Sequence, residues 1–333
     1  MKTTIPWRGQ CVALLVCAAL GLSLTGPAEA KNTGQLFISS EKDNTVTVLA
    51  GGSLEKVTVI RTAARPRGLR FNPDHTLLYV GCGDGDSVDV IDVAQKKVVE
   101  RLEVGEDPET FDLSPDARLL YISNEDDGLL TAFDLKSKKR VAEVKVGEEP
   151  EGVLASPDGR TVYVTSEVAN MVHVVDAKTF KLRSNIVVGN RPRRFALAPD
   201  GKELWVSNEL SGSVSIINTA DNKVIGEIRF EPKGFRPEDI TPVDLVMTRN
   251  GKTAYVTLGR ANHVAVVDVP GRRVRDYVLV GQRPWGMTLT RDEKTLYVTN
   301  GLSDDLSVID TGSLKVARSV PVGRVPYTVV VDD

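Results

Sequence analysis

The stretch from Pro150 to Val188 reads PEGVLASPDGRTVYVTSEVANMVHVVDAKTFKLRSNIVV and decides the fold. Ser156-Pro157-Asp158-Gly159 is a turn, because proline fixes φ and glycine accepts positive φ. The runs on either side of it, and two more beyond, are rich in β-branched and aromatic residues and show no helical period. The stretch therefore predicts four short antiparallel strands. They are expected at 151–155, 161–165, 171–175 and 182–188.

This unit recurs along the chain in steps of 42 residues, with one step of 50 between Trp205 and Tyr255. Repeats of this length are typical of β-propeller blades. The sequence therefore predicts an all-β, seven-bladed β-propeller of four-stranded antiparallel blades. One marker is an aromatic residue in the second strand: Phe37, Tyr79, Tyr121, Tyr163, Trp205, Tyr255 and Tyr297. The other is a proline before the first strand: Pro66, Pro108, Pro150, Pro192, Pro242, Pro284 and Pro326.

The order of strands at the two ends of the chain predicts how the ring closes. The repeats begin with a second strand at 35–39 and end with a first strand at 327–331. We expect blade 1 to be closed by one C-terminal strand and three N-terminal strands. Such closure removes the free sheet edges on which strands of other molecules could add.

The first 30 residues resemble a secretory signal peptide. Lys2 and Arg8 are basic, the segment 12–24 is mostly apolar, and Ala28-Glu29-Ala30 is a small-x-small cleavage signal. The apolar run is shorter than the roughly 20 residues of a membrane span. We therefore expect a signal peptide at 1–30, the propeller at 31–333, a periplasmic location and no membrane span after cleavage.

Charge and cysteine content exclude several classes of site. The formal net charge is −3, which gives no overall attraction to nucleic acid, so a nucleic-acid partner is not expected. Beyond residue 30 only Cys82 remains, which excludes an internal disulfide and a cysteine-rich metal site. His75, His173 and His263 fall in different registers of different blades, so no histidine metal site or triad is expected. A monomer without metal is the expected state.

The residue after each connector proline begins the innermost strand and faces the central channel, and these residues differ from blade to blade. Because the rest of the repeat is periodic, the positions that differ from blade to blade are the best candidates for functional residues. We expect Arg67, Arg193 and Arg283 to bind anionic groups of a ligand, with Trp285 and Tyr327 stacking on it. The alternative is a channel mouth that holds only water and internal ion pairs. The other candidate binding residues are Glu109, Glu151, Arg194 and Asp244.

Three further features lie outside this ring. The eight-residue insertion within 230–241 is expected on the face of the channel mouth, where Phe230, Phe235 and Arg236 could cover it. The loops between second and third strands are acidic and are expected to be solvated. The opposite face carries periodic basic residues, which suits nucleic acid or an acidic protein. They include Lys97, Lys139, Lys181, Arg118, Arg160, Lys202 and Lys294.

The Tyr-Val-Thr-Asn core at 297–300, the Ser-Pro-Asp-Gly turn and the Val-Gly-x-x-Pro-x-Gly connector resemble the YVTN family of β-propeller repeats. The resemblance covers about 300 residues. Secreted chains with seven such repeats are similar to the propellers associated with PQQ-dependent catabolism. That resemblance implies a periplasmic accessory of PQQ-linked alcohol oxidation, and it supplies no catalytic residues because a fold does not carry an activity with it.

These observations together predict a non-enzymatic binding or scaffold protein with its site at the channel mouth. The expected partner is an unidentified protein or a small planar anionic ligand; no cofactor is expected, although PQQ is a candidate ligand. A first alternative is a hydrolase of the lactonase type, which requires an acid–base set from Glu109, Glu151 and Asp244. A second alternative is binding of nucleic acid or acidic protein by the basic face.

Overall fold

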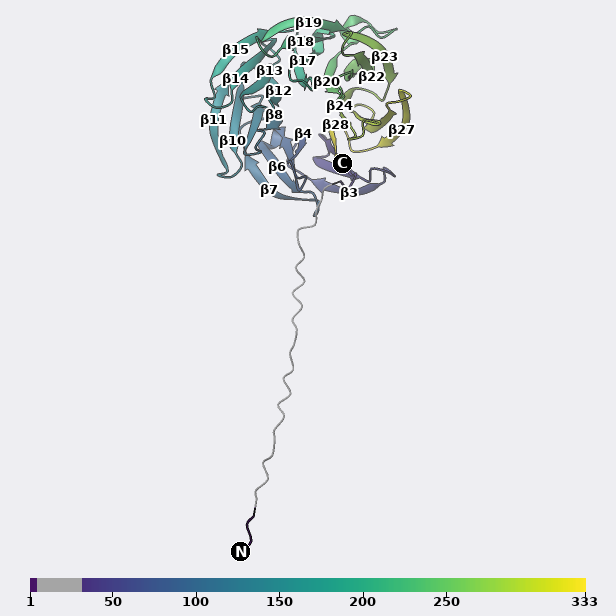
Figure 1. The fold of residues 1–333 in the computed structure, drawn as a ribbon. Coiled ribbons are helices and arrows are strands. Elements are labelled where there is room, and N and C mark those ends of the chain that lie inside the picture. Colours follow the sequence, from purple (N-terminus) through teal and green to yellow (C-terminus); the bar gives the residue numbers. More distant parts are fainter. Residues whose placement is uncertain (5–31) are drawn as a thin grey trace.

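The computed structural model describes residues 1–4 and 32–333, and it confirms the seven-bladed propeller. Seven four-stranded antiparallel sheets stand radially around a central opening (Figure 1). The predicted signal peptide at 1–30 lies almost wholly in 5–31, outside the described residues. None of the helical segments in the described part has the length and apolar character to cross a bilayer.

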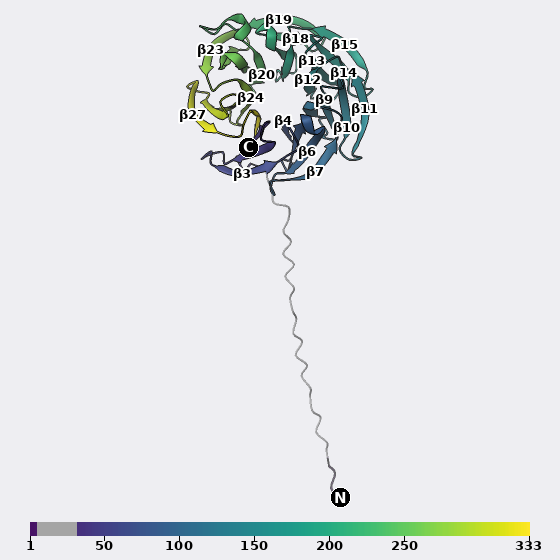
Figure 2. The same ribbon diagram turned by 180° about the vertical axis from the view of Figure 1, so that it is seen from behind.

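Each blade runs from an innermost strand at the channel to an outermost strand at the rim, and Figure 2 shows the same ring from behind. Blade 1 is β28 (Pro326–Val331), β1 (Leu36–Ser40), β2 (Thr45–Leu49) and β3 (Lys56–Arg61). Blade 2 is β4 (Pro66–Phe71), β5 (Leu77–Cys82), β6 (Ser87–Asp92) and β7 (Lys97–Glu103). Blade 3 is β8 (Pro108–Leu113), β9 (Leu119–Asn124), β10 (Leu129–Asp134) and β11 (Lys139–Lys145).

The remaining blades repeat the pattern. Blade 4 is β12 (Pro150–Ala155), β13 (Thr161–Ser166), β14 (Met171–Asp176) and β15 (Leu182–Val187). Blade 5 is β16 (Pro192–Leu197), β17 (Glu203–Asn208), β18 (Ser213–Asn218) and β19 (Lys223–Arg229). Blade 6 is β20 (Pro242–Met247), β21 (Thr253–Leu258), β22 (His263–Asp268) and β23 (Arg273–Leu279). Blade 7 is β24 (Pro284–Leu289), β25 (Thr295–Asn300), β26 (Asp305–Asp310) and β27 (Lys315–Pro321).

Every innermost strand begins at a connector proline, where the missing N–H costs no ladder bond. In blades 2 to 7 the pairing of this strand with the second strand is irregular just after the proline, as between Pro150 and Val153. The irregularity changes the direction of the next residues, which bear the channel side chains. Short 3-10 helices occupy four of the loops: η1 (Gly83–Gly85), η2 (Glu209–Ser211), η3 (Pro237–Asp239) and η4 (Gly259–Ala261).

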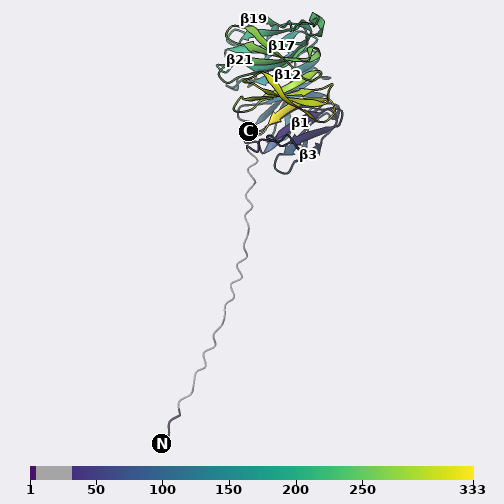
Figure 3. The same cartoon turned by 90° about the vertical axis from the view of Figure 1, so that its right-hand side faces the viewer.

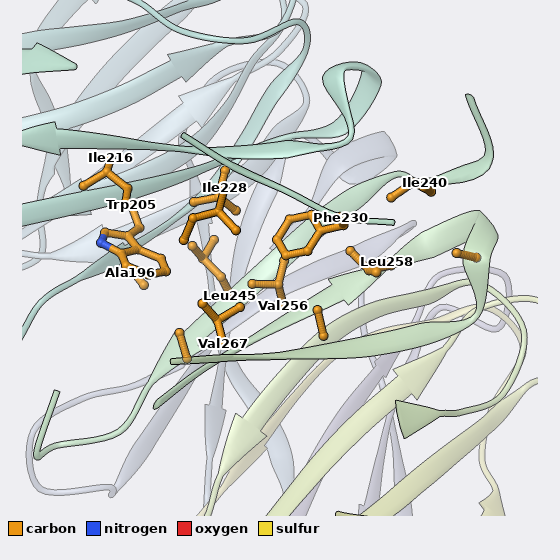
Figure 4. Packing of buried hydrophobic residues seen from close by; sticks show 14 residues of the cluster. Ala196, Trp205, Ile216, Ile228, Phe230, Ile240, Leu245, Val256, Leu258 and Val267 are labelled. Carbon is orange, nitrogen blue, oxygen red and sulfur yellow. The ribbon is translucent and has the colours of Figure 1, made fainter. Parts of the chain in front are cut away.

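Apolar side chains pack between neighbouring blades, which lie against one another as stacked sheets when the ring is seen from the side (Figure 3). The cluster between blades 5 and 6 is built around Trp205 and takes in Phe230 and Ile240 from the insertion (Figure 4). Phe235 packs on the same cluster and meets the edge of His263. Arg236 pairs with Asp239 at 2.9 Å. These contacts tie the insertion to the seam between blades 5 and 6, so the expectation that these side chains cover the mouth is wrong.

The ring closes as the sequence predicts, with β28 antiparallel to β1 and Leu36 opposite Val331. Asp332, which is fully buried, holds this junction. Its carboxylate accepts hydrogen bonds from the backbone N–H of Asn32 at 3.2 Å and of Thr33 at 3.0 Å. The same carboxylate meets Nδ1 of His75 in blade 2 at 2.8 Å.

Replacing Asp332 with alanine is expected to lower the free energy of unfolding by about 2 to 4 kcal/mol. The change removes several hydrogen bonds to a charged acceptor, each of which contributes roughly 1.5 kcal/mol or more. Urea unfolding of wild type and variant measures the difference. Glu106→Ala, at an exposed glutamate on the connector before blade 3, is the control and should unfold within about 0.5 kcal/mol of wild type, as surface changes usually do.

Candidate functional site

The channel residues come together at one end of the ring, where they line a pocket of about 300 Å³. The innermost strands supply its floor, and the connectors and the loops between second and third strands supply its walls. Strand starts are rigid supports, which is what a binding or catalytic group needs. The pocket is lined by Arg65, Arg67, Glu125, Glu151, Arg191, Arg193, Glu209, Leu210, Arg260, Arg283 and Trp285.

On the side of blades 2 and 3, Glu109 lies between two arginines. It is fully buried, with an ion pair to Nη1 of Arg67 and another to Nη2 of Arg65 at 2.9 Å. Nε of Arg67 also contacts a carboxylate oxygen of Glu41 at 3.0 Å. One carboxyl oxygen of Glu109 lies within 4.8 Å of one of Glu125, which lines the pocket. On this side of the mouth, the buried carboxyl group of Glu109 therefore lies behind Glu125, a residue of the pocket wall.

On the side of blades 4 and 5, Arg193 is the centre of the charge network. Its guanidinium is 3.3 Å from Glu151 Oε1 and pairs closely with Glu167. A third carboxylate, Glu209, lies 3.6 Å from its Nη1. Arg191 pairs with the same two loop glutamates: its Nε lies 2.6 Å from Glu167 Oε2 and 3.2 Å from Glu209 Oε2. Buried charges of both signs are thus held together by hydrogen-bonded pairing.

Tyr327 reaches across the channel from the closing strand and links the two sides. Its hydroxyl donates to Glu151 Oε1 at 2.9 Å and accepts from Arg193 Nη2 at 3.3 Å. The guanidinium of Arg67 lies 4.2 Å from the centre of its ring, and that of Arg194 lies 5.2 Å from it. Tyr327 is 1% exposed, so its side chain forms part of the floor and has no free face for a ligand.

The environment drives the pKa values of neighbouring glutamates apart. Burial would raise the pKa of Glu151, but the cations of Arg193, Arg67 and Arg194 outweigh it and hold the pKa well below the usual range. Burial instead dominates at Glu109, whose pKa is raised well above the ordinary value. Burial also raises the pKa of Glu167, to about 8. The pKa of Glu151 is therefore shifted in the opposite direction from those of Glu109 and Glu167.

This pattern predicts a loss of stability that depends on Glu167 as pH rises from about 4.5 to about 8. Its folded-state pKa of about 8 is above the usual glutamate pKa of 4.5, so between these two values the folded state binds the extra proton and loses stability as pH rises. Glu167→Gln keeps the shape of the protonated group and should remove most of this loss, which is on the order of a few kcal/mol. Urea midpoints from pH 6 to 9 test it, and equal slopes for both proteins would contradict the assignment.

Sequence reasoning did not find the loop glutamates. It placed Glu167 and Glu209 in solvated loops, whereas they are 4% and 5% exposed and hold arginines. One sequence feature could have identified these glutamates. The position directly after the second strand is glutamate in blades 1, 3, 4 and 5 and glycine in the others. Arg260 was also missed. The members of this register are Glu41, Gly83, Glu125, Glu167, Glu209, Gly259 and Gly301.

Other candidates have structural partners. Both carboxylate oxygens of Asp244 accept backbone N–H groups, from Leu245 and Met287 at 2.9 Å each, so Asp244 connects blade 6 to blade 7. Asp107, Glu109 and Glu125 bring oxygens within 4.8 Å of one another, a spacing that could hold a cation. Arg65 already pairs with Asp107 and Glu109, and it supplies the positive charge there.

The opposite face is less basic than its lysine and arginine pattern indicates. Arg118 pairs with Asp134 at 2.9 Å, and Lys202 and Lys294 each lie 3.6 Å from an aspartate two residues earlier. Turn acids therefore neutralise much of the periodic basic charge. The three histidines lie apart, since His75 contacts Asp332, His173 contacts Asn185 and His263 contacts the carbonyl of Ala261.

Two family models match parts of the chain. The model described as a lactonase, seven-bladed β-propeller, matches residues 182–331, and the model described as the cytochrome d1 haem domain matches residues 110–196. Each covers less than half of the chain, so each is a similarity and neither establishes membership. A search of curated proteins finds no match.

Many solved structures share the fold. A hydrazine synthase structure from Kuenenia stuttgartiensis is 21% identical with a TM-score of 0.76, covering 88% of this chain and 98% of that chain. The periplasmic gluconolactonase of Pseudomonas aeruginosa is 20% identical with a TM-score of 0.75, covering 89% and 98%. A dihydro-haem d1 dehydrogenase is 17% identical with a TM-score of 0.64, covering 87% and 64%. Identities this low show a common fold.

These findings correct the functional expectation. A non-enzymatic scaffold for PQQ-linked catabolism is wrong, because the lactonase model and the gluconolactonase among the structural neighbours favour the hydrolase alternative. Neither matching model is that of a PQQ-associated propeller. The resemblance to YVTN repeats holds at the level of the seven-bladed propeller.

Proposed function

We propose that the protein is a hydrolase that opens lactone rings at the channel mouth. The observation that carries the proposal is the pair Glu109 and Glu151, which are the second residues of adjacent innermost strands and have pKa values shifted in opposite directions. Neighbouring carboxyls whose pKa values are driven apart are what acid–base catalysis needs. The lactonase model over residues 182–331 supports the same reaction class.

In the proposed reaction Glu151 acts as the general base. It lines the pocket and is ionised, so it takes a proton from a water molecule as the water oxygen bonds to the lactone carbonyl carbon. The acyl carbon–ring oxygen bond then breaks. The ring oxygen takes a proton from the Glu109–Glu125 pair, whose outer member lines the pocket. The product is a hydroxy acid, and transfer of the proton on Glu151 back to the Glu109–Glu125 pair restores both groups for the next turnover.

The arginines supply the electrostatic part of the reaction. Arg193 lines the pocket beside Glu151, with its position fixed by Glu167 and Tyr327. A fixed guanidinium there stabilises the negative charge that develops on the carbonyl oxygen in the tetrahedral intermediate. Asp244 takes no part in the proposed acid–base chemistry, because both of its carboxylate oxygens accept hydrogen bonds from backbone N–H groups.

The similarity to haem proteins makes haem binding a second candidate function, but the pocket does not fit a haem group. The pocket volume of about 300 Å³ is at the lower end for small-molecule sites. None of the residues that line it is a histidine, cysteine, methionine or tyrosine, the usual protein ligands of haem iron. The basic N-terminus and the apolar segment before Ala28-Glu29-Ala30 support a periplasmic place of action for the proposed hydrolase.

The direct test is titration of the acid released when the purified protein is mixed with simple γ- and δ-lactones at constant pH. The proposal expects saturable release above the uncatalysed rate, and it expects Glu109→Gln to lower kcat by about 100-fold, as loss of a general acid does. Release that matches the buffer alone across such a panel would refute it.

A further inference from the structure

Tyr327 belongs to the last strand of the chain, β28, which closes the ring against β1. Its backbone is held from both sides of the junction. Thr299 Oγ1 donates to the carbonyl of Tyr327 at 2.8 Å, and the hydroxyl of Ser39 accepts from the N–H of Thr328 at 3.0 Å. Because Thr299 lies in blade 7 and Ser39 in blade 1, two blades fix the start of the closing strand.

The aromatic ring of Tyr327 is packed between cations and an indole. The guanidinium of Arg67 lies 4.2 Å from the ring centre, a cation–π distance, and the ring of Trp285 lies 5.5 Å away on another side. The tyrosine is 1% exposed, so a substrate in the pocket cannot touch it. Any part that Tyr327 plays in a reaction is therefore played through a neighbouring residue.

That neighbour is Glu151, whose closest contacts with donors all end on one carboxylate oxygen. Oε1 lies 2.9 Å from the hydroxyl of Tyr327, 3.3 Å from Arg193 Nη2 and 3.4 Å from Arg194 Nη2. No hydrogen bond from the part of the chain that the structure describes ends on Oε2. Since Glu151 lines the pocket, Oε2 is the oxygen that remains to take a proton from water.

The phenol is suited to hold Oε1 in this way. Burial raises the pKa of Tyr327 to about 12, so the hydroxyl keeps its proton at neutral pH and donates it to the carboxylate. A hydrogen bond to the ionised form of a carboxyl group favours that form. The same hydroxyl accepts from Arg193 Nη2 at 3.3 Å, so it also sets the distance between the base and the cation of the site. A group on a rigid strand start fixes such distances better than one on a loop.

We propose that Tyr327 is a positioning residue of the hydrolase, whose hydroxyl holds Oε1 of Glu151 so that Oε2 faces the water that attacks the lactone. The last strand of the chain then completes the general base, and catalysis requires closure of the ring by β28. This inference rests on the proposed hydrolase function and assigns the group that orients its base.

The first test is the steady-state kinetics of Tyr327→Phe with the best substrate of the lactone panel, with product measured by chromatography. The variant keeps the aromatic ring against Arg67 and removes only the hydroxyl. We expect kcat to fall about tenfold, the scale of one hydrogen bond to a charged group, and KM to stay within about twofold of wild type. The acid limb of the pH profile of kcat/KM should move to higher pH by about one unit, because Glu151 loses a donor that favours its ionised form.

Tyr297→Phe is the matched control for this variant. Tyr297 is a buried tyrosine of blade 7, 6% exposed, and is not among the residues that line the pocket. Its variant should change neither kcat nor the acid limb. A Tyr327→Phe protein with a lower melting temperature but an unmoved acid limb would show a purely structural role for the tyrosine and overturn the inference.

A spectroscopic measurement keeps the inference testable without turnover. In NMR spectra of protein labelled with carbon-13 at the glutamate carboxyl carbon, the signal of Glu151 is the one that is missing from Glu151→Gln. As pH is lowered, this signal should report proton uptake at a higher pH in Tyr327→Phe than in wild type, and Tyr297→Phe should follow wild type. Identical curves for wild type and Tyr327→Phe would overturn the inference, whereas a wild type that hydrolyses no lactone would refute the proposed hydrolase alone.

Discussion

Glu151→Gln is expected to reduce kcat/KM for lactone hydrolysis by at least about 100-fold, the lower range for loss of a general base. The amide has nearly the same shape as the carboxylate but cannot take a proton from water at neutral pH. The wild-type group is ionised because Arg193, Arg67 and Arg194 surround it. Steady-state rates over a range of lactone concentrations measure the effect.

The control for this variant is Glu148→Gln, an exposed glutamate three residues away on the connector. It should leave kcat/KM within about twofold of wild type, since surface changes outside a site have small effects. Because Glu151 is buried, the melting temperature of its variant must be measured as well, so that the rate is compared at a temperature where both proteins are folded. A folded Glu151→Gln protein with the wild-type rate would remove Glu151 from the mechanism.

Arg193→Met is expected to lower the free energy of unfolding by about 3 to 5 kcal/mol, the usual cost of removing one partner from a buried ion pair. Arg193 is 4% exposed and contacts Glu151, Glu167 and Glu209. Its loss leaves the ionised Glu151 with a single direct guanidinium contact, from Arg194 at 3.4 Å. Equilibrium unfolding in urea measures the change.

Arg191→Met is the matched comparison. Arg191 contacts Glu167 and Glu209 as well, but its side chain is 40% exposed, so water can replace its charge. Its loss should cost about 1 kcal/mol or less, as for exposed pairs. If the two variants were equally stable, the network would be no more than a set of solvated surface pairs.

Most of the fold could be predicted from the sequence, because each blade repeats the same pattern of turn, strand and connector residues. The connector prolines, the aromatic residues of the second strands and the order of strands at the chain ends gave the seven blades and their closure by β28. The position of the insertion at 230–241 could be predicted, but its packing could not. Phe230 and Ile240 are ordinary apolar residues, and only the three-dimensional seam between blades 5 and 6 shows why they are buried.

Less of the site could be predicted. The ring position of Glu109 and Glu151 followed from the register, and their proximity followed from adjacent blades. The opposite shifts of their pKa values could not be foreseen, because they depend on burial and on which arginines approach each carboxylate. Glu167 shares its register with Glu125, which is only half-buried, so the register marks the position but does not predict the burial. The burial of Glu167 results from Arg193 and Arg191, which lie in the following blade.

The rate of acid release from simple γ- and δ-lactones, followed at pH 7 with wild-type protein and with Glu151→Gln, tests the central claim most directly. The account predicts saturable turnover by the wild type and a loss of at least about 100-fold in the folded variant. A wild-type rate equal to that of buffer for every lactone tested, or equal turnover by both proteins, would contradict it.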